Sequence, residues 1–294
     1  MLCSIHFATL WRCAFLLMLC LSSEAMAKNP QRLVSLSPNL TELVYALGLE
    51  SHLVGRSSAC DYPPDAKSIP VVGDFGRPNH EALLNARPDV VLLTDLENPG
   101  IRMQLERQGI HTMVLSCEGW TEMMDAARQM GLIFDQEAAA NVWIAELEQR
   151  LAELNDRVNK AFSRHERPSV YVEIWGNPIT TAGQNSMLHE VVELAGGRHI
   201  GSSLNGRYMA ISTEWVVQAD PEIIVLAYML DGMRPAEALR RRMGWKNIRA
   251  VAQNRIIDDI SPDVLLRPGP RLIDGAEGLA LRILSHSRMQ IHGR

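Results

Sequence analysis

The acidic, histidine and cysteine residues of this chain do not form a known catalytic motif. Residues 80–84 (HEALL) and 189–193 (HEVVE) begin like the zinc-binding H-E-x-x-H motif, but neither ends in histidine. The chain also has no G-x-S-x-G, P-loop or G-x-G-x-x-G sequence. We therefore expect no catalytic residues, no metal site and no enzymatic activity.

Two cysteines remain as candidates for chemistry, because the other three lie in the amino-terminal segment described next. Cys60 and Cys117 are too far apart in the sequence for a C-x-x-C metal motif. In an oxidising compartment they can either pair as a disulfide or stay as free thiols, and the sequence leaves both outcomes open. Together with His80 they could instead form the metal site of an exported enzyme, which is our alternative from a different functional class.

The amino-terminal segment has the layout of a secretory signal peptide. Arg12 precedes an apolar run that ends at Leu21, and Ala25-Met26-Ala27 is a small-x-small cleavage pattern. The apolar run is shorter than the roughly 20 residues that a membrane-spanning helix needs. We expect residues 1–27 to be removed by cleavage near Ala27 and the mature protein to be exported.

The charge of the chain bears on its binding partner, and its length bears on the number of domains. The 294 residues carry a net charge of −5, and no run of lysine and arginine suggests a nucleic-acid partner. Without the signal peptide, the chain is long enough for two domains of ordinary size.

Short apolar runs typical of β-strands alternate with helical segments in both halves of the chain. In the first half, runs at 33–36, 53–55, 90–93 and 113–115 are separated by helical patterns at 41–47 and 102–108. In the second half, runs at 170–174, 223–226 and 255–257 accompany helical patterns at 187–195 and from Pro270 to Ile283. This alternation predicts an α/β fold with parallel sheets.

A long helix is expected between the two halves. Residues 136–162 contain neither glycine nor proline, and Leu147, Leu151, Leu154 and Val158 recur at steps of three or four. This pattern predicts one amphipathic helix of about 40 Å. We therefore divide the chain into a signal peptide (1–27), an amino-terminal α/β lobe (28–135), a connecting backbone helix (136–167) and a carboxyl-terminal α/β lobe (168–294).

An internal repeat indicates that the two lobes are related. Residues 80–93 (HEALLNARPDVVLL) align without gaps with residues 213–226 (TEWVVQADPEIIVL). Each segment predicts a short helix, a proline turn and a buried strand. Glu81 and Glu214 occupy equivalent positions, as they would if a pseudo-two-fold axis related the lobes.

Several ordered sequence blocks resemble one family of binding proteins. The blocks are residues 32–48, Asp61-Tyr62-Pro63-Pro64, and residues 87–91, 181–183 and 193–197. In order and spacing they are similar to the periplasmic binding proteins for cobalamin, haem and ferric siderophores, over essentially the whole mature chain. The resemblance implies two Rossmann-like lobes joined by a single long backbone helix (a class III periplasmic binding protein), with a ligand held in the cleft between them.

The cobalamin-binding members are the most similar, and this resemblance implies the ligand contacts. Asp61 and Tyr62 match a cleft tyrosine motif, Phe75 and Tyr208 match aromatic positions, and Asp263 and Arg267 match a carboxyl-terminal cleft loop. Trp175 is an additional aromatic residue, whereas Thr94 and Val264 stand where tryptophans are expected. An aromatic set of this kind suits a corrin, which is a broad apolar ring edged with amides.

The resemblance also implies how such a protein works. It would be a monomer without a cofactor that captures cobalamin or a related corrinoid and docks on the dimeric permease of an inner-membrane ABC importer. Glutamates matching Glu81 and Glu214 pair with permease arginines in the cobalamin-binding relatives, so we expect both residues at the docking surface. Their simpler role would be to complement a helix dipole from the first helical turn.

Haem or a ferric siderophore is the alternative ligand in the same fold. Haem would need an axial tyrosine or histidine, for which Tyr62 is a candidate. A siderophore would need several arginines in the cleft, and the candidates are Arg56, Arg77, Arg207 and Arg267.

Overall fold

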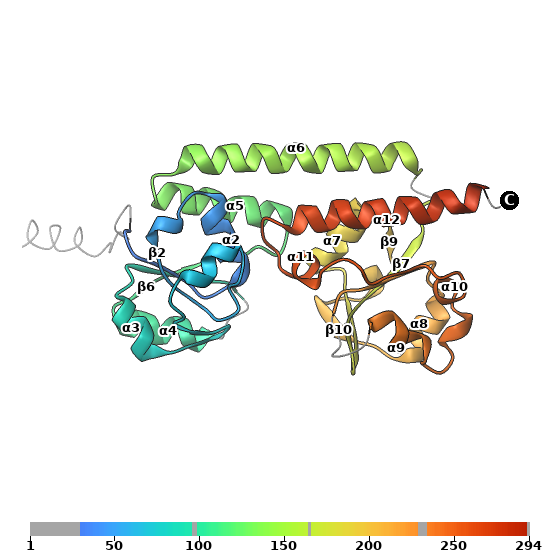
Figure 1. The fold of residues 1–294 in the computed structure, drawn as a ribbon, viewed down its shortest axis with the longest axis horizontal. Helices are drawn as coiled ribbons and strands as arrows, with labels where there is room; N and C mark the ends of the chain where they lie inside the picture. The colour runs from blue at the N-terminus through green and yellow to red at the C-terminus, as the bar shows by residue number, and fades with distance from the viewer. Residues whose placement is uncertain (1–29, 96–98, 164–165, 229–233, 293–294) are drawn as a thin grey trace, which may run out of the picture.

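The computed structural model describes residues 30–95, 99–163, 166–228 and 234–292. They form two α/β lobes that lie side by side, with long helices along one side of both lobes (Figure 1). The predicted signal peptide lies outside the described residues. Within them, no helix combines the length and the apolar character that crossing a membrane requires.

The first lobe is built on a parallel sheet of four strands in the order β2-β1-β5-β6. Apolar residues alternate between its two faces: Leu33 and Leu92 face the long helices, whereas Val34 and Leu93 face the outer helices. Helices cover both faces, so the central strands are apolar throughout. The strands are β1 (Leu33–Ser35), β2 (Leu53–Arg56), β5 (Val90–Leu93) and β6 (His111–Val114), and the helices around them are α2 (Pro38–Ala46), α3 (His80–Ala86) and α4 (Pro99–Arg107).

The sheet of the second lobe differs from the prediction because it is mixed rather than parallel. Strand β7 (Ser169–Gly176) pairs in parallel with β11 (Ile223–Leu226) and β9 (Arg198–His199), but antiparallel with β8 (Ile179–Ala182). Only two residues connect β7 to β8, and such a short connection permits only antiparallel pairing. The outer strands are β10 (Tyr208–Ala210), antiparallel to β8, and β12 (Ile256–Ile257), parallel to β11.

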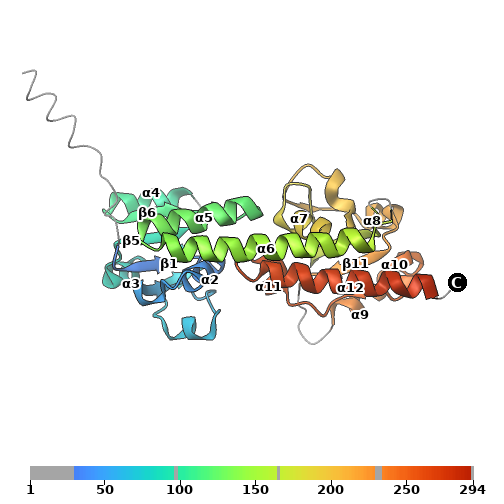
Figure 2. The ribbon, with the colours of Figure 1, turned by 90° about the horizontal axis from the view of Figure 1, so that it is seen from above.

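Three long helices cover the same side of the two sheets. The predicted central helix is α6 (Glu137–Ala161), with Gln136 and Phe162 as its capping residues. It runs over both lobes and lies beside α5 (Trp120–Ile133) in the first lobe and α12 (Leu272–His292) in the second (Figures 1 and 2). Helix α12 extends nine residues beyond the predicted end at Ile283. One hydrophobic cluster passes from Leu43 of α2 through this layer to Val191 of α7 (Met187–Leu194), so the lobes share a continuous core.

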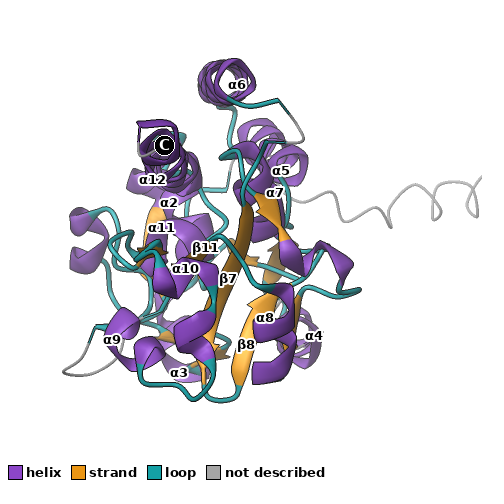
Figure 3. Ribbon diagram, turned by 90° about the vertical axis from the view of Figure 1, so that its right-hand side faces the viewer, coloured by secondary structure: helices purple, strands orange, loops and turns teal. Residues whose placement is uncertain are grey.

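The internal repeat folds into the same unit twice. Helix α3 and helix α8 (Thr213–Ala219) are each seven residues long, and each begins with a side-chain cap and ends at a residue with positive φ. A four-residue buried strand, β5 or β11, follows each helix in the middle of its sheet. Both helices lie on the side of the molecule away from α6 (Figures 1 and 3). Glu81 and Glu214 are exposed in the first turns of these helices.

Shorter elements complete the two lobes. In the first lobe, the hairpin of β3 (Gly73–Asp74) and β4 (Arg77–Pro78) carries Phe75 between its strands. In the second lobe, the remaining helices are α9 (Pro235–Arg240), α10 (Arg249–Ala252) and α11 (Pro262–Leu266).

Candidate functional site

The first lobe opens into a cavity of about 310 Å³ at the carboxyl end of its sheet. Because parallel strands end at the same edge of a sheet, the residues that follow β1, β5 and β6 come together there. Its lining includes Asn39, Phe75, Thr94, Asp95, Cys117 and Glu118.

A second cavity of about 280 Å³ lies at the carboxyl ends of β7 and β11 in the second lobe. Trp175 and Tyr228 line it, together with Asp263 of α11. Leu266 lines both cavities, so they form two halves of one cleft between the lobes. A ligand in this cleft would contact both lobes.

The four aromatic residues predicted to contact ligand are between 40% and 55% exposed. Among the described residues, no other phenylalanine, tyrosine or tryptophan is exposed to this extent. Phe75 lines the first cavity and Trp175 lines the second, whereas Tyr62 and Tyr208 line neither. Although Tyr208 is 42% exposed, partial desolvation of its hydroxyl raises the pKa of Tyr208 to about 12, with a further contribution from the charge of Glu118.

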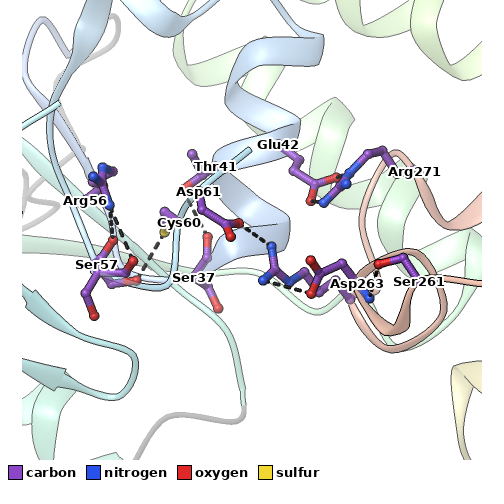
Figure 4. Close-up of polar contacts among 12 residues, drawn as sticks. Ser37, Thr41, Glu42, Arg56, Ser57, Cys60, Asp61, Ser261, Asp263 and Arg271 are labelled. Carbon is purple, nitrogen blue, oxygen red and sulfur yellow. Dashed lines mark hydrogen bonds and ion pairs between the residues drawn. The ribbon is translucent and has the colours of Figure 1, made fainter. Parts of the chain in front are cut away.

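The predicted residues Asp61, Asp263 and Arg267 form one ion-paired group, which we call the Arg267 group. The Arg267 guanidinium lies 2.6 Å from a carboxylate oxygen of Asp61 and 3.0 Å from one of Asp263. Figure 4 shows the Asp61 and Asp263 side chains pointing toward the same guanidinium. The hydrogen bond from Arg267 lowers the pKa of Asp61. Because Asp61 belongs to the first lobe, this group joins the lobes across the cleft.

A second ion-paired group, which we call the Arg207 group, also joins the lobes. Arg207 of the second lobe lies 3.2 Å from Asp95 and 3.8 Å from Glu118 of the first lobe. Burial raises the pKa of Glu118, although Arg207 acts in the opposite direction. The sequence comparison with the family did not predict Asp95 or Glu118 as site residues. Their position just after β5 and β6 was the available signal.

The loop between α11 and α12 is fixed on the first lobe by a buried ion pair. Arg271 donates two hydrogen bonds, of 2.6 and 2.9 Å, to the carboxylate of Glu42, which is almost fully buried (Figure 4). Burial raises the pKa of Glu42, and the hydrogen bonds from Arg271 oppose this rise. The same guanidinium stacks on the Tyr62 ring, 3.7 Å from its centroid. Arg271 therefore holds Tyr62 in a defined orientation beside the cleft.

Both cysteines are free thiols and both are buried. The Cys60 thiol lies 3.1 Å from the hydroxyl of Ser57, whereas Cys117 lines the first cavity. Of the two outcomes left open by the sequence, the structure contains the free thiols. In the part of the chain that the structure describes, no three His, Cys, Asp or Glu side chains are grouped so that they could hold a metal ion.

The four arginines considered for a siderophore do not converge in the cleft. Arg56 is buried and donates to the backbone carbonyls of Ser57 and Lys67. Arg77 is exposed and lines neither cavity. Arg207 and Arg267 are already held between carboxylates, as described above.

Comparisons with known proteins agree with this architecture. The model of the periplasmic binding protein family matches residues 33–262. The chain is 30% identical to the ABC transporter substrate-binding lipoprotein YvrC of Bacillus subtilis (strain 168), over 86% of this chain and 80% of that protein. It is 26% identical to a vitamin B12-binding protein of Pectobacterium atrosepticum, over 91% of this chain and 92% of that protein.

A solved structure provides a further likeness. A periplasmic heme binding protein from Pseudomonas aeruginosa superposes with a TM-score of 0.77 at 29% sequence identity, covering 87% of this chain and 93% of that one.

The chain therefore belongs to the periplasmic binding protein family, with the two-lobed fold of class III. It is a substrate-binding protein of an ABC transporter, which takes up a small ligand and delivers it to a membrane permease. Members of this family are binding components of transporters and not enzymes.

Proposed function

We propose that this protein captures cobalamin or a related corrinoid in the cleft between its lobes. The observation that carries the proposal is the set of exposed aromatic residues, Tyr62, Phe75, Trp175 and Tyr208. Exposed aromatic rings on both lobes suit a broad, flat and largely apolar ligand. The vitamin B12-binding relative, which is similar over nearly its whole length, supports the same ligand class.

The charged residues of the cleft agree with this ligand. A corrin is edged by amides, which bind to carboxylates and neutral polar groups without needing a free arginine. Asn39, Asp95 and Glu118 offer such groups in the first cavity, and Asp263 offers one in the second.

Haem is the second candidate, and two observations favour it. One is the structural likeness to a heme binding protein at 29% identity. The other is Tyr62, whose exposed ring is held in place by Arg271 and could supply an axial oxygen ligand. Against haem, its two carboxylates would find, among the described residues of the cavity walls, no arginine that is free of a carboxylate partner.

We also propose that Glu81 and Glu214 dock the loaded protein on its permease. They lie in equivalent exposed positions in the first turns of α3 and α8, and these two helices lie on the side of the molecule away from α6 (Figure 1). A dimeric permease would present two equivalent basic sites, and charge-assisted bonds to them would orient the cleft toward the transport path.

A spectroscopic titration tests the ligand. Purified mature protein would be titrated with cyanocobalamin, dicyanocobinamide and haemin while the ultraviolet-visible spectrum is recorded. We expect saturable binding of one or both corrinoids at one ligand per chain. Binding of haemin with a shifted Soret band, together with no binding of either corrinoid, would show that the second candidate is correct.

A further inference from the structure

Two of the arginines that join the lobes, Arg267 and Arg207, are each outnumbered by carboxylates. In the Arg267 group, one guanidinium faces Asp61 and Asp263. In the Arg207 group, one guanidinium faces Asp95 and Glu118. Each group therefore has a formal net charge of −1, and each guanidinium is already paired with two carboxylates.

The described residues of the cavity walls include no cation that compensates this negative charge. Among the described residues that line either cavity, Arg267 is the only basic one, and it is already paired with Asp61 and Asp263. A ligand carboxylate that entered the cleft would lose its bound water without gaining an ion pair to a basic side chain that has no carboxylate partner already. The excess negative charge would also repel it. A neutral or cationic ligand would meet neither obstacle.

Glu118 has an unused acceptor in the wall of the first cavity. Its side chain is only 11% exposed, and its oxygen Oε2 is buried without a hydrogen-bond partner among the described residues. Leaving a buried polar oxygen unsatisfied is unfavourable, so a ligand that donates a hydrogen bond to it would gain affinity. Amide N–H groups at a ligand's edge are donors of this kind.

We propose that Asp95 and Glu118 are specificity-determining residues that select the ligand by charge. They favour an uncharged or cationic ligand with N–H donors at its edge, and they exclude ligands edged by carboxylates. This inference rests on the proposed binding function and names the chemical class of ligand that the cleft accepts.

Two isosteric variants separate charge from shape. Glu118→Gln and Asp95→Asn each remove one negative charge with little change in volume. Asp156→Asn removes the same charge from an exposed position of α6, a helix without residues in the described lining of either cavity, and is the matched control. Calorimetry would measure the affinity of each protein for cyanocobalamin (uncharged), ferrioxamine B (cationic) and haemin (two carboxylates), and melting temperatures would verify that each variant is folded.

We expect Glu118→Gln to bind cyanocobalamin about tenfold more weakly than the wild-type protein, because a charge-assisted hydrogen bond is lost. Asp95→Asn releases Arg207 from one carboxylate, so haemin should bind about five- to tenfold more tightly. Asp156→Asn should change neither affinity.

The outcomes distinguish this inference from the proposed function. If the wild-type protein binds cyanocobalamin and both cleft variants have the same ligand affinities as Asp156→Asn, the proposal of charge selection is wrong and the proposal of corrinoid binding is retained. If the wild-type protein binds ferrioxamine B but no corrinoid, and Glu118→Gln weakens that binding, the ligand assignment is wrong and charge selection stands. Tight binding of haemin by the wild-type protein, equal to that of Asp95→Asn, would overturn charge selection.

Discussion

Tyr62 is the residue whose surroundings most clearly suit ligand binding. Arg271 covers one face of its ring and is itself fixed by Glu42, yet the ring remains 40% exposed. A ring that is already oriented loses little conformational freedom when a ligand stacks on it. In the proposed binding mode, the buried ion pair would contribute to affinity by orienting Tyr62, although Glu42 and Arg271 line neither cavity.

The two cysteines should be chemically inert in the folded protein. Burial raises the pKa of Cys117 to about 12 and also raises the pKa of Cys60, so neither forms the reactive thiolate at neutral pH. We expect no alkylation by iodoacetamide in the native state at pH 8 and two alkylated cysteines after denaturation without reductant. Mass spectrometry of the mature protein measures both, and finding no alkylatable thiol after denaturation would show that a disulfide exists instead.

His199 should make the folded state sensitive to acid. Its side chain is fully buried, with its Nδ1 atom 3.3 Å from that of His189, and burial lowers the pKa of His199 to about 4. Between pH 6.5 and 4 the unfolded chain therefore binds a proton that the folded chain does not. Above pH 6.5 this difference in proton binding does not lower the free energy of unfolding. As the pH falls from 6.5 toward 4, the free energy of unfolding decreases by up to roughly 3 kcal/mol.

The test of this pH dependence compares the wild-type protein with His199→Gln. Urea unfolding from pH 7.5 to pH 4.5 should show a decline in the free energy of unfolding that is smaller in the variant. Parallel declines in the two proteins would mean that His199 does not cause the effect.

At the scale of elements, α6 holds the two lobes through one apolar stripe. Leu147, Leu154 and Val158 are buried on one side of α6, and Arg150 bridges to Asp274 and Glu277 of α12. The exposed ion pairs add little, whereas the buried side chains contribute most of the stabilisation.

Truncation within this stripe should therefore destabilise the whole protein. Leu154→Ala should lower the free energy of unfolding by about 2–5 kcal/mol, because it leaves a cavity in the shared core. Val142→Ala, at a 60% exposed position of the same helix, should change it by no more than about 0.5 kcal/mol. Equal effects of the two changes in denaturant unfolding would contradict this account of α6.

Regular periodicity made α6 predictable, and a similar signal was overlooked for α5. Its buried residues Met123, Ala126, Ala127 and Met130 also recur at steps of three and four, but none of them is a large branched residue. Strands β8 and β10 were not predicted, because β8 contains two threonines and β10 has only three residues, so neither forms an apolar run. Their antiparallel direction was missed with them, because apolar runs alone do not specify the direction of pairing. Pairing depends on connection length, which the short turn after β7 would have indicated.

The candidate site was only partly predictable, because some of its contacts join residues that are far apart in the sequence. Strand ends could be located from the sequence, and Thr94, Asp95, Cys117 and Glu118 follow predicted strands directly. The partner of Asp95 and Glu118 is Arg207, which comes from the other lobe and is far away in the sequence. Contacts across the cleft depend on how the lobes are placed, and no local pattern encodes that placement.

At the scale of the whole molecule, the lobes are joined by more than the connecting helix. Their core is continuous through α5, α6 and α12. Separating the lobes would expose this apolar layer to water. We therefore expect only a small hinge movement when ligand binds.

Docking on the permease should depend on both lobes at once. Glu81→Ala and Glu214→Ala should each leave ligand affinity unchanged and slow uptake of labelled cobalamin by cells that carry the native importer. The double variant should be slower than either single variant, because each glutamate would contact its own basic site. The control is Asp156→Asn on α6, and wild-type uptake by the double variant would refute the docking assignment.

The most direct test of the central claim is calorimetric titration of the mature protein and two Tyr62 variants with cyanocobalamin. The wild-type protein should bind one molecule per chain, Tyr62→Phe should retain this affinity, and Tyr62→Ala should bind about 5- to 150-fold more weakly, as expected for loss of a stacked ring. All three proteins should have similar melting temperatures, because Tyr62 lies at the surface. Absence of saturable binding by the folded wild-type protein, or undiminished affinity of Tyr62→Ala, would contradict a corrinoid site between the lobes.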